Sequence, residues 1–155
     1  MIDLTALHPD VSGALREAGW YPERHTDAAR WASLEDGGYT YHALAREILE
    51  RLDGLTIVPV RQDGPNFVND DPLVFDPAEG WGCRSVAEDV EEQLGGSYFP
   101  LGSWLSHSTV FVETRGRVIA AGYGPILELG TTFESALEVL VRSHRPIVQV
   151  GIQRS

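Results

Sequence analysis

Residues 108–123, STVFVETRGRVIAAGY, decide the fold class of this 155-residue chain. Two runs rich in β-branched residues, 108–113 and 117–123, lie on either side of Arg115-Gly116, a dipeptide suited to a tight turn. The pattern predicts a β-hairpin, in which the two strands pair antiparallel. Short apolar runs at 126–129 and 147–152 predict two further strands, and we expect the last to lie at an edge of the sheet.

The clearest helix signal follows this hairpin. Thr131 and Glu134 have the spacing of a capping box, in which each side chain bonds a backbone N–H at a helix start. The apolar residues that follow have the i, i+3, i+4, i+7 spacing of a core-facing stripe. They are Phe133, Ala136, Leu137, Leu140 and Val141.

The N-terminal part of the chain predicts helices rather than strands. We expect helices over 10–19, 28–36 and 41–53, with Asp27 and Thr40 as the caps of the second and third. A strand is expected at 55–60, followed by a loop over 61–82 that contains a short strand at 73–75. Helices first and hairpin strands later predict an α+β fold, a single domain over 1–155 with a mainly antiparallel sheet. The predicted core includes Trp31, Leu44, Ile48, Leu49, Leu52, Val110, Val112, Leu137 and Leu140.

Residues 85–94, SVAEDVEEQL, predict one more helix with an acidic face. Ser85 and Glu88 have capping-box spacing, and Gly95-Gly96 follows as a stop signal. The expected buried stripe is Val86, Val90 and Leu94. The opposite face has four acids, Glu88, Asp89, Glu91 and Glu92. Such a face is either merely solvated or faces a positively charged partner.

The acidic bias extends beyond this helix. Asp and Glu occur eight times between residues 70 and 92 and Arg once, and the formal net charge of the chain is -11. A chain with this balance repels phosphate backbones, so we expect no direct nucleic-acid binding. It attracts basic proteins. We define the acidic patch as the candidate partner-binding residues Asp70, Asp71, Glu79, Glu88, Asp89, Glu91 and Glu92.

Several kinds of protein are disfavoured by the composition. Cys83 is the sole cysteine, which excludes an internal disulfide. The first residues lack signal-peptide order and no apolar run reaches about 18 residues, so we expect a cytoplasmic protein outside the membrane. No two histidines have zinc-helix spacing, and Ser103 with His107 lacks a nucleophile elbow. We therefore expect no catalytic residues, no metal and no cofactor.

Four segments occur in an order that resembles the SUKH superfamily of bacterial immunity proteins, in its third subgroup. They are 31–55 (WASLEDGGYTYHALAREILERLDGL), Phe75-Asp76-Pro77, Phe99-Pro100-Leu101-Gly102, and the block from Val110 through Gly130 to Leu140. The resemblance spans roughly residues 14–145. It departs from the family at 52–55 (LDGL), where an aromatic residue and a second glycine are common.

This resemblance implies a protein that binds and neutralises a cognate bacterial polymorphic toxin, such as a basic nuclease or deaminase. The family has no catalytic residues to transfer to this chain. Two alternatives stay open: a small enzyme whose active site is dispersed over loops, and an intracellular scaffold or regulator, a role that the resemblance also implies. The oligomeric state is not predicted.

Overall fold

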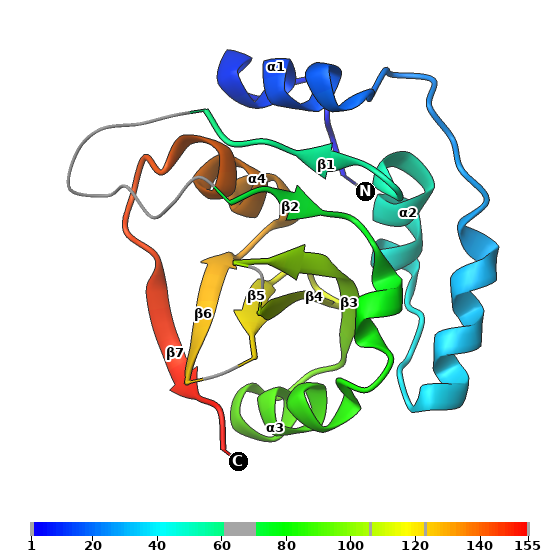
Figure 1. The fold of residues 1–155 in the computed structure, drawn as a ribbon, viewed down its shortest axis with the longest axis vertical. Helices are drawn as coiled ribbons and strands as arrows, with labels where there is room; N and C mark the ends of the chain where they lie inside the picture. Colours follow the sequence, from blue (N-terminus) through cyan, green and yellow to red (C-terminus); the bar gives the residue numbers. More distant parts are fainter. Residues whose placement is uncertain (1, 61–70, 106, 123, 155) are drawn as a thin grey trace.

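Seven antiparallel strands form one sheet in the computed structural model, which describes residues 2–60, 71–105, 107–122 and 124–154 (Figure 1). Strand order in the sheet equals strand order in the chain. The strands are β1 (Thr56–Ile57), β2 (Leu73–Val74), β3 (Tyr98–Trp104), β4 (Ser108–Glu113), β5 (Val118–Ala121), β6 (Pro125–Gly130) and β7 (Val148–Ile152). The hairpin predicted around Arg115-Gly116 is confirmed as β4 and β5.

Helices pack around this sheet, so the predicted α+β class is confirmed. They are α1 (Pro9–Ala18), the 3₁₀ helix η1 (Ala28–Gly37), α2 (Ala43–Leu52), the short 3₁₀ helix η2 (Pro77–Gly80), α3 (Arg84–Leu94) and α4 (Phe133–Arg142). Helix α4 packs on β6 and α1, whereas α3 contacts β3 and β5. Figure 1 shows α1 and α3 at opposite ends of the sheet, with α2 and η1 along one side.

One hydrophobic cluster joins the sheet to the helices. Seven of the nine predicted core residues are buried: Ile48, Leu49, Leu52, Val110, Val112, Leu137 and Leu140. The prediction is wrong for Trp31 and Leu44, which are half-buried and pack against the edge of the cluster. Trp31 lies at the periphery because its indole N–H donates to a carboxylate there, and Leu44 lies in the first turn of α2.

Two predicted helix caps are displaced by one or two residues. Helix α2 is capped by His42, whose Nδ1 accepts the Ala45 N–H at 3.2 Å, and Thr40 does not cap it. Burial lowers the pKa of His42, which keeps this acceptor nitrogen unprotonated. Helix α4 is capped by Thr132 rather than Thr131, because the Thr132 hydroxyl accepts the Ser135 N–H at 3.1 Å.

The capping box predicted for the acidic helix is also wrong. Helix α3 begins at Arg84, and the Cys83 carbonyl accepts the Ala87 N–H, which places Ser85 already inside the first turn. No side chain among the described residues caps this start. The predicted stripe is confirmed in part, because Val90 is buried while Val86 and Leu94 are half-buried against the core.

The strands also differ from the prediction at two places. Strand β1 is two residues long rather than six, and β3, which lies between β2 and β4, was not predicted as a full strand. Proline and glycine are typical strand breakers. Here a register shift between Pro100 and Gly102 accommodates both within β3.

The last strand is at an edge of the sheet, as predicted. Pro146 precedes β7, and the β6–β7 register shifts between Ile126 and Leu127. The Gln93 side chain of α3 donates to the Ile152 carbonyl at 2.8 Å and accepts the Ile152 N–H at 3.4 Å. Helix α3 is thereby joined to the end of β7.

Candidate protein-binding surface

The structure describes six of the seven residues of the acidic patch and separates them into three groups. Glu79, Glu88 and Glu92 are exposed. Asp89 and Glu91 have internal partners. Asp71 is half-buried, with contacts of its own, and Asp70 lies outside the described residues. The predicted acidic face of α3 is therefore two exposed glutamates beside two carboxylates that hold the structure together.

Asp89 anchors the C-terminal residues on α3. Its side chain is about 10% exposed, and its carboxylate accepts the Arg154 N–H and guanidinium at 2.7 Å each. The Gln93 and Gln153 amides donate to the same carboxylate at 3.0 and 2.8 Å. The hydrogen bond from the Arg154 backbone, followed by that from the Gln93 side chain, lowers the pKa of Asp89 to about 2. Asp89 thus stays ionised and paired within the chain.

Glu91 connects the same helix to the sheet. Its carboxylate pairs with the Arg84 guanidinium at 2.9 Å and accepts the Tyr98 N–H of β3 at 2.9 Å. The Arg84 guanidinium also lies 5.1 Å from the centre of the Tyr39 ring. This cation is therefore already neutralised by Glu91, and neither it nor any other described cation pairs with the exposed Glu79 or Glu88.

The exposed acids come from two elements that follow one another in the chain. Glu79 is on η2, whereas Glu88 and Glu92 are one turn apart on the outer face of α3. Glu92 pairs with Arg154 at 3.1 Å although its own side chain is 73% exposed. Burial raises the pKa of Tyr39, and the Arg84 guanidinium over its ring places the start of α3 beside the segment that follows η1.

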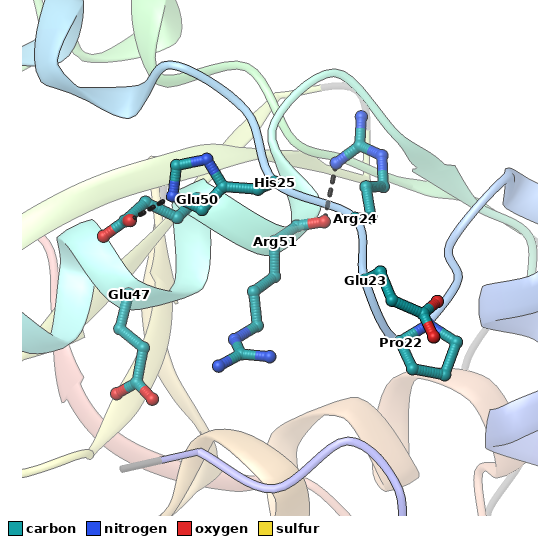
Figure 2. Close-up of a pocket in the computed structure, with 7 residues that line it drawn as sticks. All are labelled: Pro22, Glu23, Arg24, His25, Glu47, Glu50 and Arg51. Atoms are coloured by element: carbon teal, nitrogen blue, oxygen red, sulfur yellow. Dashed lines mark hydrogen bonds and ion pairs between the residues drawn. The ribbon is translucent and has the colours of Figure 1, made fainter.

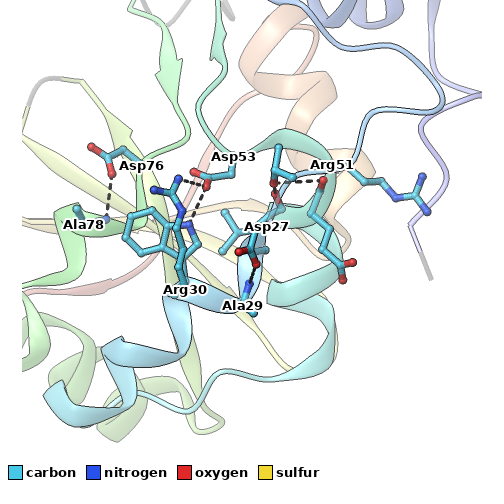
Figure 3. A network of polar contacts seen from close by, with 12 residues as sticks. Asp27, Ala29, Arg30, Arg51, Asp53, Asp76 and Ala78 are labelled. Atoms are coloured by element: carbon cyan, nitrogen blue, oxygen red, sulfur yellow. Dashed lines mark hydrogen bonds and ion pairs between the residues drawn. The ribbon is translucent and has the colours of Figure 1, made fainter.

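A second polar cluster is centred on Asp53, at the end of α2 (Figure 3). The Asp53 side chain is 3% exposed, and one carboxylate oxygen accepts from Arg30 and from the Trp31 indole at 2.7 Å each. The Arg30 guanidinium lies 4.6 Å from the centre of the Trp31 ring. Asp53 therefore fastens η1 to α2 by satisfying the indole N–H.

Replacing Asp53 by alanine is expected to lower the free energy of unfolding by about 1–3 kcal/mol, because it leaves the half-buried Trp31 indole N–H without its acceptor. Urea unfolding monitored by circular dichroism measures this change. Asp36→Ala is the control, since Asp36 is an exposed acid on the same 3₁₀ helix and should change stability by less than about 0.5 kcal/mol. Equal effects of the two substitutions would contradict the role of Asp53.

The family model described as SUKH-3 immunity protein matches residues 7–143 of the chain. This chain belongs to the SUKH-3 immunity protein family. The predicted resemblance is confirmed, and the match is wider than the predicted span of 14–145 at its N-terminal end. No curated protein and no solved structure matches the chain.

The Asp53 cluster lies within the part of the chain that matches the SUKH-3 family. Gly54 follows Asp53 with a φ of 86°, a left-handed conformation suited to glycine at a helix end.

A polar pocket of about 230 Å³ lies between α2 and the segment before η1 (Figure 2). Arg51 extends into it, and His25 pairs with Glu50 at 2.7 Å on its wall. No hydroxyl or thiol nucleophile occurs among the described residues that line the pocket. These residues are Pro22, Glu23, Arg24, His25, Glu47, Glu50 and Arg51.

Within 2–60, 71–105, 107–122 and 124–154, no group of three or more His, Cys, Asp or Glu side chains is placed to hold a metal ion. No helix in the described part of the chain is long and apolar enough to cross a membrane. The expectation that this immunity protein has no metal, cofactor or catalytic residue stays a prediction.

Trp81 is the surface residue that the sequence analysis missed. It lies between η2 and α3 and is 49% exposed. The sequence contained a signal for this exposed residue: Trp81 has glycine on both sides, Gly80 and Gly82, within an acidic stretch. This motif differs from a core tryptophan, which normally lies within an apolar periodic pattern.

Proposed function

We propose that this SUKH-3 protein acts in the cytoplasm by binding directly to a basic toxin of the nuclease or deaminase class and neutralising it. The carrying observation is the exposed part of the acidic patch, Glu79, Glu88 and Glu92, in a chain of net charge -11. Asp70 and Asp71 stay in the proposal as flanking charges. Asp89 and Glu91 support the surface from within, because they hold the C-terminal residues and β3 against α3.

Electrostatic complementarity acts mainly on the rate of encounter. Opposite charges on the two partners steer them together, and this attraction weakens as salt screens it. Exposed pairs at the rim of an interface each add only about 0–1 kcal/mol to affinity. A change in the α3 charges should therefore appear in the association rate, and most strongly at low ionic strength.

The test is the association rate of the purified chain with the toxin whose gene neighbours its own. Glu88→Gln with Glu92→Gln is expected to slow association by up to about tenfold near 0.01 M salt, with the difference lost near 1 M salt. The matched control is Glu17→Gln with Glu23→Gln, which removes the same charge from exposed positions outside α3.

The two double variants separate the possible outcomes. Slower association of the α3 variant alone supports the proposed surface. Equal rates for both variants would show that the toxin binds elsewhere, and the absence of any complex with the wild-type chain would overturn direct neutralisation. Circular dichroism of each variant checks that the fold is unchanged.

A further inference from the structure

Trp81 is an aromatic residue held in place yet half exposed to water. Its six-membered ring packs against Gly37 of η1, so closely that a Cβ on Gly37 would lie 3.1 Å from Cζ3. The backbone N–H of Trp81 donates to the Ala78 carbonyl at 3.1 Å, which closes η2. An indole that is already immobilised loses little conformational entropy when a partner covers it.

Two carboxylates without internal partners belong to residues next to those that hold this indole. Asp36 precedes the glycine on which the ring packs, and Glu79 is two residues before Trp81. Both side chains are exposed, and like Glu88 they form no ion pair or hydrogen bond within the part of the chain that the structure describes. We define the Trp81 surface as Trp81, Asp36, Glu79 and Glu88.

Glu88 belongs to this surface through Tyr39. The Tyr39 hydroxyl donates to the carbonyl of Gly80, the residue before Trp81, at 2.8 Å. The Arg84 guanidinium lies 5.1 Å from the centre of the same tyrosine ring, and Glu88 is one turn farther along the same face of α3. The Trp81 surface therefore combines residues of η1, η2 and α3 that are up to 52 positions apart in the chain (88 − 36).

We propose that the Trp81 surface is the centre of the toxin-binding interface and takes an arginine or lysine side chain of the toxin. This inference rests on the proposed function and adds to it the contact residue and the chemistry of its partner. Indole is the best aromatic acceptor of a cation, and it is most effective when the contact is desolvated. The three carboxylates then orient and neutralise the same cation. Tryptophan is also enriched among the few residues that dominate binding energy.

The first experiment uses a defined probe. The four tryptophans give four indole N–H resonances in a ¹H–¹⁵N spectrum, and Trp81→Phe assigns the resonance of Trp81 by its loss. Titration with acetyl-Arg-Arg-amide is expected to shift the Trp81 resonance saturably, with smaller shifts for Trp20, Trp31 and Trp104. Acetyl-Glu-Glu-amide should shift none of them. Equal shifts of all four indoles with the arginine peptide would overturn the proposal.

Charge variants test the carboxylates in the same titration. Glu79→Gln with Glu88→Gln is expected to weaken the arginine-peptide effect on Trp81 several-fold. Glu17→Gln with Glu23→Gln removes the same charge from positions outside the Trp81 surface and should leave the effect unchanged. Equal weakening by the two variants would show that net charge alone attracts the peptide, which overturns a site at Trp81.

The second experiment measures the lifetime of the complex with the toxin of the neighbouring gene. Trp81→Ala is expected to raise the dissociation rate by about tenfold or more with little change in association, and Trp81→Phe by less, because phenylalanine keeps an aromatic face. Thermal unfolding verifies that both variants fold. A complex with unchanged lifetime in Trp81→Ala overturns this inference and leaves the proposed function standing. If the wild-type chain forms no complex with the toxin, the proposed function is overturned. The peptide titration then still tests whether the Trp81 surface binds a cation.

Discussion

Replacing Gly102 by alanine is expected to destabilise the protein by about 3 kcal/mol or more, at the top of the usual range for overpacking. Gly102 lies in β3, and a Cβ at this position would be 1.8 Å from the Val74 carbonyl oxygen of β2. That atom belongs to backbone and cannot rotate away, so one of the two strands must move. Chemical denaturation monitored by circular dichroism measures the loss.

Gly13→Ala is the matched control for this substitution. Gly13 lies inside α1, and a Cβ there would have no heavy atom within 4 Å. Alanine in the interior of a helix is favoured over glycine by about 0.8–1 kcal/mol, so this variant should be more stable than the wild type. Destabilisation of the same size in both variants would mean that the strand contact is not the cause.

Replacing Leu137 by alanine is expected to cost about 2–5 kcal/mol of unfolding free energy. Leu137 is fully buried on α4, which packs against β6 and α1, and its loss leaves a cavity in the centre of the cluster. Thermal and urea unfolding both report this change.

Leu137→Met distinguishes a cavity from a general sensitivity of α4. Methionine nearly preserves the side-chain volume, so this variant should cost less than about 1.5 kcal/mol. A loss in Leu137→Ala no larger than that in Leu137→Met would contradict the place of Leu137 in the core.

Local patterns made much of this fold predictable. The alternation around Arg115-Gly116 and the stripe from Phe133 to Val141 each depend on residues close in sequence, and both appear in the structure at nearly the expected bounds. Helix starts were less certain because adjacent residues offer similar chemistry. Thr131 and Thr132 both provide a hydroxyl, and the backbone geometry of the finished helix decides between them.

The sequence predicted that acidic residues are concentrated between residues 70 and 92. It did not predict which of them are exposed on the surface. The Asp89 carboxylate is covered by its contacts with Arg154, which is 65 residues away in the chain. No local pattern indicates such a pairing, because it depends on where β7 ends relative to α3. Trp81 had a local signal in its two flanking glycines, whereas the contact of its ring with Gly37, 44 positions earlier (81 − 37), depends on the tertiary fold.

The edge formed by β7 bears on how this protein behaves when many copies are close together. An unprotected edge strand is a template on which strands of another molecule can add, and this leads to aggregation. Pro146 limits pairing at the start of β7, the register shift near Ile126 distorts its middle, and Gln93 occupies the backbone groups of Ile152 at its end. The edge is therefore poorly suited to intermolecular sheet growth, even though Val148 and Ile152 are exposed on it.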